Sequence, residues 1–392
     1  AAAGADRVVA VVGNDPHLGG RETEDRATLD LPQAAAELVR TAREANPATV
    51  LAVVSSYPYA LGDLAADLDA VVWSGHGGQE LGNGLADVLL GEVEPRGRLA
   101  QTWFAADADL PDVLDYDVQS TGGTYLWSEA EPLYPFGHGL TYTHIEHVAA
   151  RADRRTARDG DVVTLTVELA NTGTRPGEEL VQVYATAPGL RPRSPRRRLV
   201  AHRRVPLAPG ERTAVELAVP VAALAVHDVV SGRPLVVPGE HHLLVGASAA
   251  DVRHEVALTV EGPAPAPRPL GSAAGFDACR DVRLVPREGF AGSAVRTVAP
   301  GTAGVLEFAD VGTGGADRLR CTARADGPAE VEVAVRGTSG AWLVVGRAVV
   351  PAGGWDVVDV ALRRALPGRA DLRVRLRGDV ALAELELPAR QA

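Results

Sequence analysis

The stretch from residue 7 to residue 54 reads RVVAVVGNDPHLGGRETEDRATLDLPQAAAELVRTAREANPATVLAVV, and it decides the fold class of the first part of the chain. Short apolar runs at residues 7–12 and 49–55 are of the kind that forms fully buried strands. Between them, Pro32 opens a segment with one apolar face, which predicts a helix. A third apolar run follows at residues 69–73. This repetition of strand and helix predicts an α/β sandwich, with a mostly parallel sheet and flanking helices.

The second half of the chain has a different pattern. From about residue 146, apolar and polar residues alternate in several short segments, and turn signals such as Pro209-Gly210 separate them. This pattern predicts an antiparallel β-sandwich. A Pro/Ala linker at residues 263–270 leads to further short strands, which predict a second all-β domain of the jelly-roll type. The predicted domains are therefore 1–145, 146–262 and 271–392.

Composition excludes several classes of function. The chain has 392 residues, of which 46% are hydrophobic, and a formal net charge of −12, which argues against a dedicated nucleic-acid binder. No apolar run approaches the ~18 residues of a membrane helix, and residues 1–12 lack the features of a signal peptide. The absence of methionine predicts that the chain as given is either trimmed at its start or cut from something longer.

The sequence predicts neither a metal site nor a cofactor. Cys279 and Cys321 are the two cysteines, too few for a thiol metal motif. They form either one disulfide or two small buried hydrophobic residues. No glycine-rich dinucleotide loop or phosphate-binding loop follows a predicted strand.

The densest polar segment is residues 13–32, directly after the first predicted strand. Loops at the carboxyl ends of parallel strands carry binding and catalytic sites. Glu22, Glu24 and Asp25 crowd together here with Arg21 and Arg26. A carboxylate near other carboxylates can keep its proton near neutral pH and act as a general acid. A solvated charged loop is the alternative interpretation.

This segment resembles the start of the C-terminal α/β sandwich domain of glycoside hydrolase family 3. Residues 22–26 (ETEDR) match the family's Glu-Gly-x-Asp-Arg pattern, with Thr23 in place of the glycine. The resemblance implies that Glu22, three residues before Asp25, is the acid/base residue, with Glu24 as the second candidate. It assigns Asp25 to ordering the loop, together with Arg26.

Two further segments carry the same resemblance. Residues 77–101 (GGQELGNGLADVLLGEVEPRGRLAQ) are similar to a family stretch that ends in Pro-x-Gly-Arg-Leu. Residues 132–142 (PLYPFGHGLTY) match the family's Pro-Leu-Phe/Tyr-Pro-Phe-Gly-His-Gly-Leu-Ser/Thr-Tyr almost completely. The second segment predicts an irregular strap with a structural histidine, His138, and three buried aromatic residues. Those aromatic residues are Tyr134, Phe136 and Tyr142.

The later domains resemble parts that accompany this family. Residues 171–184 and 207–211 are similar to its fibronectin type III-like domain, whose long loop would hold the arginine cluster of residues 191–204. Residues 271–392 resemble a carbohydrate-binding module of the family 6 type. In such a module, Trp342 is a candidate for stacking on a sugar ring. A jelly-roll spacer without sugar binding is the alternative.

The resemblance implies an exo-acting retaining β-glycosidase that acts on an oligosaccharide or another glycoside. Such enzymes use two carboxylates, and in this family the nucleophilic Asp lies in an N-terminal barrel, which this sequence does not contain. We therefore expect the chain alone to be nearly inactive. His17 and Arg21 are candidate substrate-binding residues, and both a β-glucosidase and a β-xylosidase fit the sequence. A non-catalytic carbohydrate-binding or scaffolding protein derived from such an enzyme is the rival interpretation.

Overall fold

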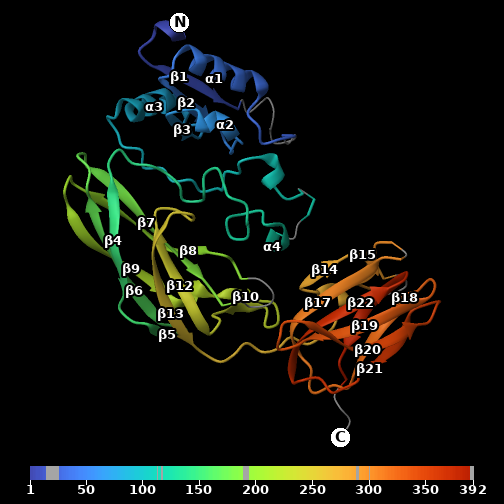
Figure 1. Ribbon diagram of the computed structural model, residues 1–392. Coiled ribbons are helices and arrows are strands. Elements are labelled where there is room, and N and C mark those ends of the chain that lie inside the picture. The colour runs from blue at the N-terminus through green and yellow to red at the C-terminus, as the bar shows by residue number, and fades with distance from the viewer. Residues whose placement is uncertain are drawn as a thin grey trace. The chain divides into compact units, whose positions relative to one another are not determined.

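The computed structural model describes residues 1–14, 26–112, 114–115, 118–188, 194–287, 291–299 and 301–388 (Figure 1). As far as its residues are described, the chain divides into two compact units. The first comprises Ala1–Pro188, Pro195–Ala225 and Pro238–Gly262, and the second comprises Gly189–Ser194, Val226–Val237 and Pro263–Ala392. No helix in the described part of the chain is both long and apolar enough to span a bilayer.

The first unit begins with a three-stranded parallel sheet, which confirms the predicted α/β pattern. Strands β1 (Val8–Gly13), β2 (Thr49–Val54) and β3 (Ala70–Ser74) lie in the order β1-β2-β3. Helix α1 (Gln33–Ala45) begins after Pro32, whose carbonyl accepts the first helical N–H groups, and it packs along β1 and β2 (Figure 1). The other helices are short, as follows: α2 (Gly62–Ala66), α3 (Leu81–Leu90), α4 (Val118–Thr121), η1 (Ala2–Gly4), η2 (Gly78–Glu80), η3 (Asp107–Asp109), η4 (Val221–Leu224) and η5 (Ala273–Gly275).

The prediction that the first strand is fully buried is wrong. Ala10 and Val12 of β1 are buried against α1, but Val9 and Val11 on the other face are 45% and 56% exposed. Because successive side chains of a strand point to opposite faces, an apolar run is fully buried only when both faces of the sheet are covered. Over β1, the described residues cover one face.

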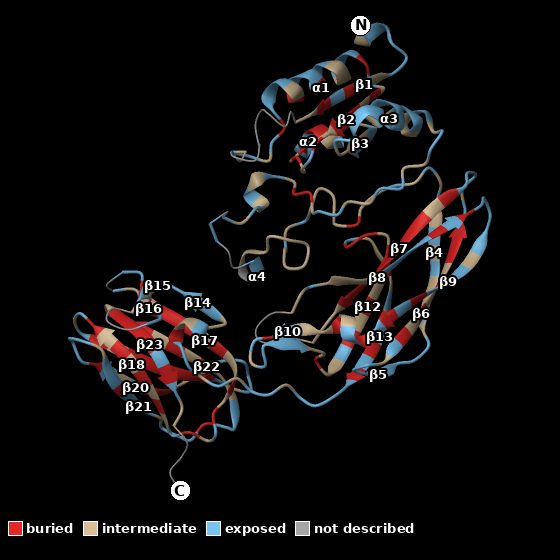
Figure 2. Cartoon of the chain, turned by 180° about the vertical axis from the view of Figure 1, so that it is seen from behind, coloured by how far each residue is buried: buried red, intermediate tan, exposed pale blue. Residues whose placement is uncertain are grey.

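A β-sandwich follows the α/β part and the strap in the first unit, as the alternating pattern predicts. One sheet has the order β4-β6-β9 and the other β5-β13-β12-β7-β8, and inward-facing residues of both are buried (Figure 2). The strands of the first sheet are β4 (Ile145–Ala152), β6 (Val162–Asn171) and β9 (Arg212–Pro220). Those of the second are β5 (Thr156–Arg158), β7 (Gly177–Thr186), β8 (Arg198–Leu207), β12 (Gly239–Gly246) and β13 (Val252–Glu261).

The arginine cluster of residues 191–204 does not form one long loop, which corrects the prediction. Residues 198–204 belong to β8, which pairs with β7 along its whole length. Strand β8 lies at the edge of its sheet, so its outward positions are open to solvent and accommodate arginines such as Arg203 and Arg204. Residues 191–193 lie outside the described part of the chain.

The second unit is mainly a sandwich of two five-stranded sheets around one hydrophobic core (Figure 2). One sheet contains β14 (Ala278–Arg280), β17 (Ala303–Gly312), β22 (Arg369–Arg377), β19 (Ala329–Arg336) and β20 (Trp342–Val350). The other contains β15 (Val282–Pro286), β16 (Ser293–Thr297), β23 (Val380–Glu386), β18 (Arg318–Ala325) and β21 (Asp356–Ala361). A separate hairpin consists of β10 (Val226–Asp228) and β11 (Arg233–Leu235).

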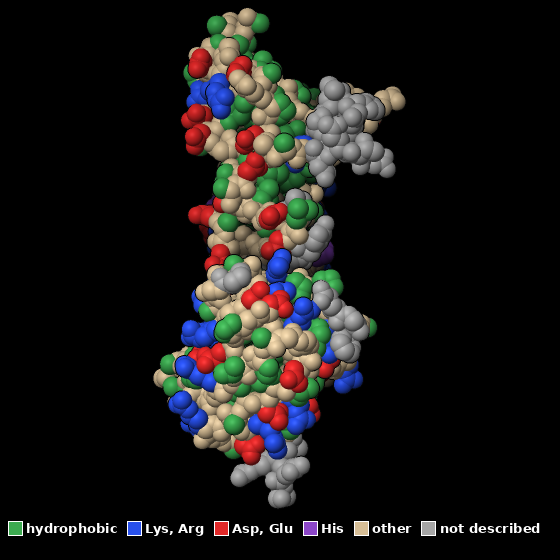
Figure 3. Space-filling model, turned by 90° about the vertical axis from the view of Figure 1, so that its right-hand side faces the viewer, with side chains coloured by type: hydrophobic (Ala, Val, Ile, Leu, Met, Phe, Trp, Pro, Cys, Tyr) green, Lys and Arg blue, Asp and Glu red, His purple; other side chains and the backbone are tan. Residues whose placement is uncertain are grey.

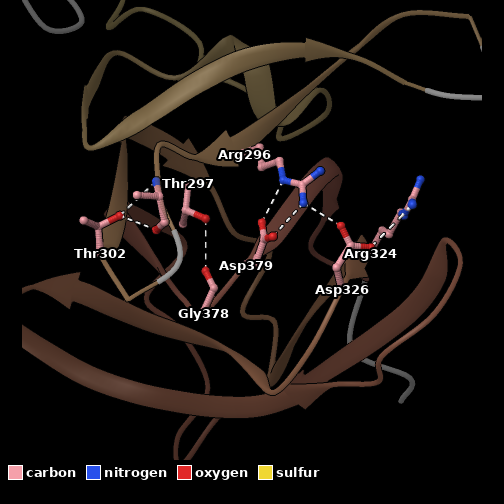
Figure 4. A network of polar contacts seen from close by, with 8 residues as sticks. Arg296, Thr297, Thr302, Arg324, Asp326, Gly378 and Asp379 are labelled. Carbon is pink, nitrogen blue, oxygen red and sulfur yellow. Dashed lines mark hydrogen bonds and ion pairs between the residues drawn. The ribbon is translucent and has the colours of Figure 1, made fainter.

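Paired charges cover much of the surface of this sandwich, and Figure 3 shows acidic and basic side chains interspersed there. One cluster joins three segments (Figure 4). Arg296 of β16 donates from Nε and Nη2 to Asp379, 2.8 Å in both cases, and from Nη2 to Asp326 at 2.5 Å. Hydrogen bonding to Arg296 lowers the pKa of Asp379. Such partly exposed pairs fix loop geometry more than they add stability.

The two cysteines are not joined by a disulfide, and only one of them is buried. Cys279 lies exposed on β14, and Cys321 is buried in β18 of the opposite sheet. Neither alternative from the sequence is therefore correct for both residues. Burial raises the pKa of the Cys321 thiol to about 12, so this thiol stays protonated and unreactive at neutral pH.

We expect a thiol-specific reagent to modify Cys279 alone in the native chain and both cysteines after unfolding. Reagent uptake measured at neutral pH, with and without denaturant, checks this expectation. The variant Cys279→Ser is the control and should react only after unfolding. Uptake of two equivalents by the native chain, or of none, would contradict the placement of these side chains.

Candidate active site

The candidate site lies at the carboxyl end of the parallel sheet, where polar residues follow each of the three strands. Asn14 follows β1, and its side-chain oxygen accepts the backbone N–H of Ser56 at 3.0 Å. The same oxygen lies 3.2 Å from Nε2 of His76, which follows β3. A Cβ on Gly13 would overlap the carbonyl oxygen of Val54, so glycine lets the end of β1 approach β2 closely. One side chain thus links the ends of the three strands.

The predicted acid/base loop runs between two anchored residues. Glu22, Glu24, His17 and Arg21 lie outside the described residues. Asn14 precedes the loop and Arg26 follows it. The guanidinium carbon of Arg26 lies 3.6 Å from the centre of the Tyr57 ring, and both terminal nitrogens donate to the carbonyl of Pro58 at 3.3 Å.

Both ends of the loop are therefore attached to the segment that follows β2. A buried tyrosine, Tyr59, supports this attachment from below Tyr57. Tyr59 is buried beneath Tyr57, and their rings meet edge to face with 5.6 Å between centres. Burial, followed by the effect of Tyr57, raises the pKa of Tyr59 to about 12, so its phenol is neutral near pH 7 and supports the loop anchor instead of exchanging protons.

A row of aromatic rings leads from β3 to the strap. Trp73 meets Trp103 edge to face at 6.0 Å between ring centres, Trp103 meets Tyr134 at 5.9 Å, and His138 stacks on Tyr134 at 5.1 Å. Trp103 is buried in the core of the α/β part, whereas Trp73 at the end of β3 is exposed.

Backbone hydrogen bonds hold the strap at Gly137 and His138. The carbonyl of His138 accepts the N–H of Leu99 at 2.8 Å, and the N–H of Gly137 donates to the carbonyl of Leu99 at 2.7 Å. Burial, and then the nearby charge of Arg98, lower the pKa of His138, which keeps its ring neutral. The prediction that three aromatic residues of the strap are buried is wrong, because Tyr142 is exposed and Tyr134 and Phe136 are only half-buried. The hydroxyl of Tyr142 donates to the carbonyl of Val88 in α3.

Polar contacts join the strap to the β-sandwich, and sequence reasoning missed them. The side-chain amide of Gln182 on β7 donates to the carbonyl of Gly137 at 3.0 Å, and the hydroxyl of Tyr184 donates to Gln182 Oε1 at 2.6 Å. Glu94 accepts the N–H of Glu178 at 2.9 Å and the hydroxyl of Thr141. The sequence feature that could have indicated these contacts is Gln182, a glutamine at a position of β7 that faces the interior.

Trp342, the predicted sugar-stacking residue, is half-buried at the start of β20. The guanidinium of Arg373 lies 4.2 Å from its ring and that of Arg336 lies 4.9 Å from it. Its role in sugar binding stays a prediction. Among the described residues there is no group of three or more His, Cys, Asp or Glu side chains that could hold a metal ion.

Comparison with known proteins agrees with this arrangement. Residues 1–142 match the glycosyl hydrolase family 3 C-terminal domain, and residues 179–249 match the fibronectin type III-like domain. A β-glucosidase of Rhizobium radiobacter is 36% identical over 262 residues, which is 62% of this chain and 32% of that protein. A xylan 1,4-β-xylosidase of Xylanibacter ruminicola is 30% identical over 258 residues, 63% of this chain and 29% of that protein.

A solved structure supports the same assignment. A β-glucosidase from Streptomyces venezuelae in complex with D-glucose superposes with a TM-score of 0.60 at 29% identity, over 66% of this chain and 34% of that one. The chain thus spans about a third of the length of these relatives. The first part of this chain, residues 1–142, is thus a glycosyl hydrolase family 3 C-terminal domain, and a fibronectin type III-like domain follows it.

Proposed function

We propose that the chain is the C-terminal portion of an exo-acting retaining β-glycosidase, a β-glucosidase or β-xylosidase, that removes terminal β-linked sugars from oligosaccharides. The observation that carries this proposal is the attachment of both ends of the acidic loop, at Asn14 and Arg26, to the carboxyl end of the sheet. Its relatives are β-glucosidases and a β-xylosidase, which supports the substrate class.

The mechanism needs two carboxylates about 5–5.5 Å apart. Glu22 protonates the glycosidic oxygen while an aspartate of an N-terminal barrel attacks the anomeric carbon, and the leaving group departs as an alcohol. Glu22, now a carboxylate, takes a proton from water, and the resulting hydroxide releases the sugar from the aspartate. Glu24 is the alternative acid/base residue, and His17 and Arg21 contact the substrate.

The proposal also covers the domains that follow the α/β part, of which the last one binds carbohydrate. We assign residues 146–262 to the fibronectin type III-like domain and 263–270 to the linker. Residues 271–392 form a jelly-roll domain that binds carbohydrate through Trp342. The start of β4 at Ile145 and the end of β13 at Glu261 support these boundaries. The crossing of the chain between the two sheets of the second unit supports the jelly roll.

The test compares this chain with the complete protein encoded by its gene. We expect the upstream reading frame to encode a barrel with a nucleophilic aspartate. The complete protein should hydrolyse p-nitrophenyl β-D-glucoside or β-D-xyloside, and the chain alone should be at least about a thousandfold slower, because it lacks the nucleophile. A gene that starts at residue 1, or a complete protein that binds oligosaccharides without hydrolysing them, would favour the non-catalytic alternative.

A further inference from the structure

Trp73 is an exposed aromatic residue at the carboxyl end of the sheet. Its side chain is 40% exposed, and among the described Trp, Tyr and Phe residues only Tyr142, at 41%, is comparably exposed. The ring is nevertheless fixed. Its indole N–H donates to Ser55 Oγ at 3.0 Å, and one edge packs against Trp103. A large apolar ring that is held in one orientation with part of its surface open is pre-organised for a ligand.

Several polar residues lie at the same end of the sheet as this ring. Ser55 continues into the exposed Ser56, whose N–H donates to Asn14, and Asn14 in turn contacts the exposed ring of His76. Asn14, Ser56 and His76 thus form one hydrogen-bonded group from the ends of all three strands. The peptide bond between Ser55 and Ser56 connects this group to the hydrogen-bond partner of Trp73. An aromatic face beside several hydroxyl, amide and imidazole groups is what a sugar ring requires, because a sugar has both apolar C–H faces and a hydroxyl rim.

The other exposed apolar residues of the sheet do not extend this surface. Val12 pairs with Val53, and Val53 pairs with Trp73, so these three side chains share the face that α1 covers. Val9 and Val11 point to the opposite face. The exposed ring of Trp73 therefore does not belong to a larger apolar patch of this sheet. A protein partner would need such a patch.

We propose that Trp73 is a stacking platform for one sugar ring of the glycoside substrate, with His76 and Asn14 as hydrogen-bonding partners of its hydroxyl groups. The identity of the ligand as a glycoside rests on the proposed function. The position at the carboxyl end of the sheet, beside the anchors of the acidic loop, places the platform where a substrate of that loop would lie.

The test measures the kinetics of the complete protein on cellobiose and xylobiose. Stacking binds the ground state and the transition state alike, so we expect Trp73→Ala to raise KM about tenfold with kcat within about twofold of the parent. Trp73→Phe should recover part of the loss. Tyr142→Ala, which removes an equally exposed ring from the strap, should leave KM unchanged. Thermal unfolding of each variant identifies any that fail to fold.

Two results would overturn the proposal. One is a KM for Trp73→Ala that stays within twofold of the parent on both disaccharides. The other is a Trp73 that acrylamide cannot quench in the complete protein, because the ring is then covered by polypeptide. If the complete protein hydrolyses neither disaccharide, the proposed function fails separately. The platform is then tested by fluorescence titration of this chain with cellobiose, where a saturable change that Trp73→Phe abolishes supports it and no change overturns it.

Discussion

Replacing Glu22 by alanine in the complete protein is expected to slow hydrolysis of glycosides with poor leaving groups by about 10²–10⁴-fold. A poor leaving group, such as the alcohol of a second sugar, needs a proton as the glycosidic bond breaks, whereas p-nitrophenolate departs without one. The loss on p-nitrophenyl glycosides should therefore be much smaller. Added azide should restore turnover on these substrates and yield a glycosyl azide, because the azide anion attacks the enzyme-bound sugar without a general base. Comparing kcat/KM for the two substrate types, with and without azide, checks this expectation.

Glu24 and Glu37 provide the controls for this experiment. Glu24→Ala removes the same charge from the same loop, and Glu37→Ala removes it from the exposed side of α1. A leaving-group dependence in Glu24→Ala instead of Glu22→Ala would transfer the acid/base role to Glu24. Activity equal to that of the parent on poor leaving groups in both loop variants would remove the acid/base role from this segment.

The elements that the sequence predicts well depend on local signals. The parallel strands are continuous apolar runs, and α1 begins at a proline whose fixed φ suits the first turn of a helix. The exposure of Val9 and Val11 depends instead on what covers the second face of the sheet. The apolar run contains no information about that, so sequence reasoning assumed a cover on both faces.

The same distinction between local and long-range features applies to the candidate site. The charged loop was visible because its acidic residues are neighbours in the sequence. Its anchoring was not, because Arg26 reaches Tyr57 and Pro58 across a whole helix and strand. Glu94 and Glu178 are 84 positions apart, and no local pattern connects them. Trp73 could have been singled out, since it is a large aromatic residue near the end of an apolar strand, and its indole N–H needs a hydrogen-bond partner where it packs against other residues.

Gly137→Ala is expected to destabilise the first unit by about 3 kcal/mol or more, as a loss in its free energy of unfolding. Gly137 has a φ of +84°, and a Cβ there would overlap Oε1 of Gln182 and lie 2.7 Å from the hydroxyl of Tyr184. Both groups belong to the buried contact between the strap and β7. If Gln182 moves to make room, the carbonyl of Gly137 loses its hydrogen-bond donor inside the protein.

Gly160→Ala separates the two causes of this loss. Gly160 lies in the same unit with a φ of +91°, but nothing lies within 4 Å of a Cβ there. Its substitution introduces the left-handed backbone strain alone, about 1–2 kcal/mol, so the difference between the two variants measures the overlap with Gln182 and Tyr184. Denaturant unfolding of the chain, followed through the transition of the first unit, provides both values. Equal losses would mean that the strap is not packed tightly against β7. A larger loss in Gly137→Ala would confirm that the strap is packed tightly against Gln182 and Tyr184 of β7.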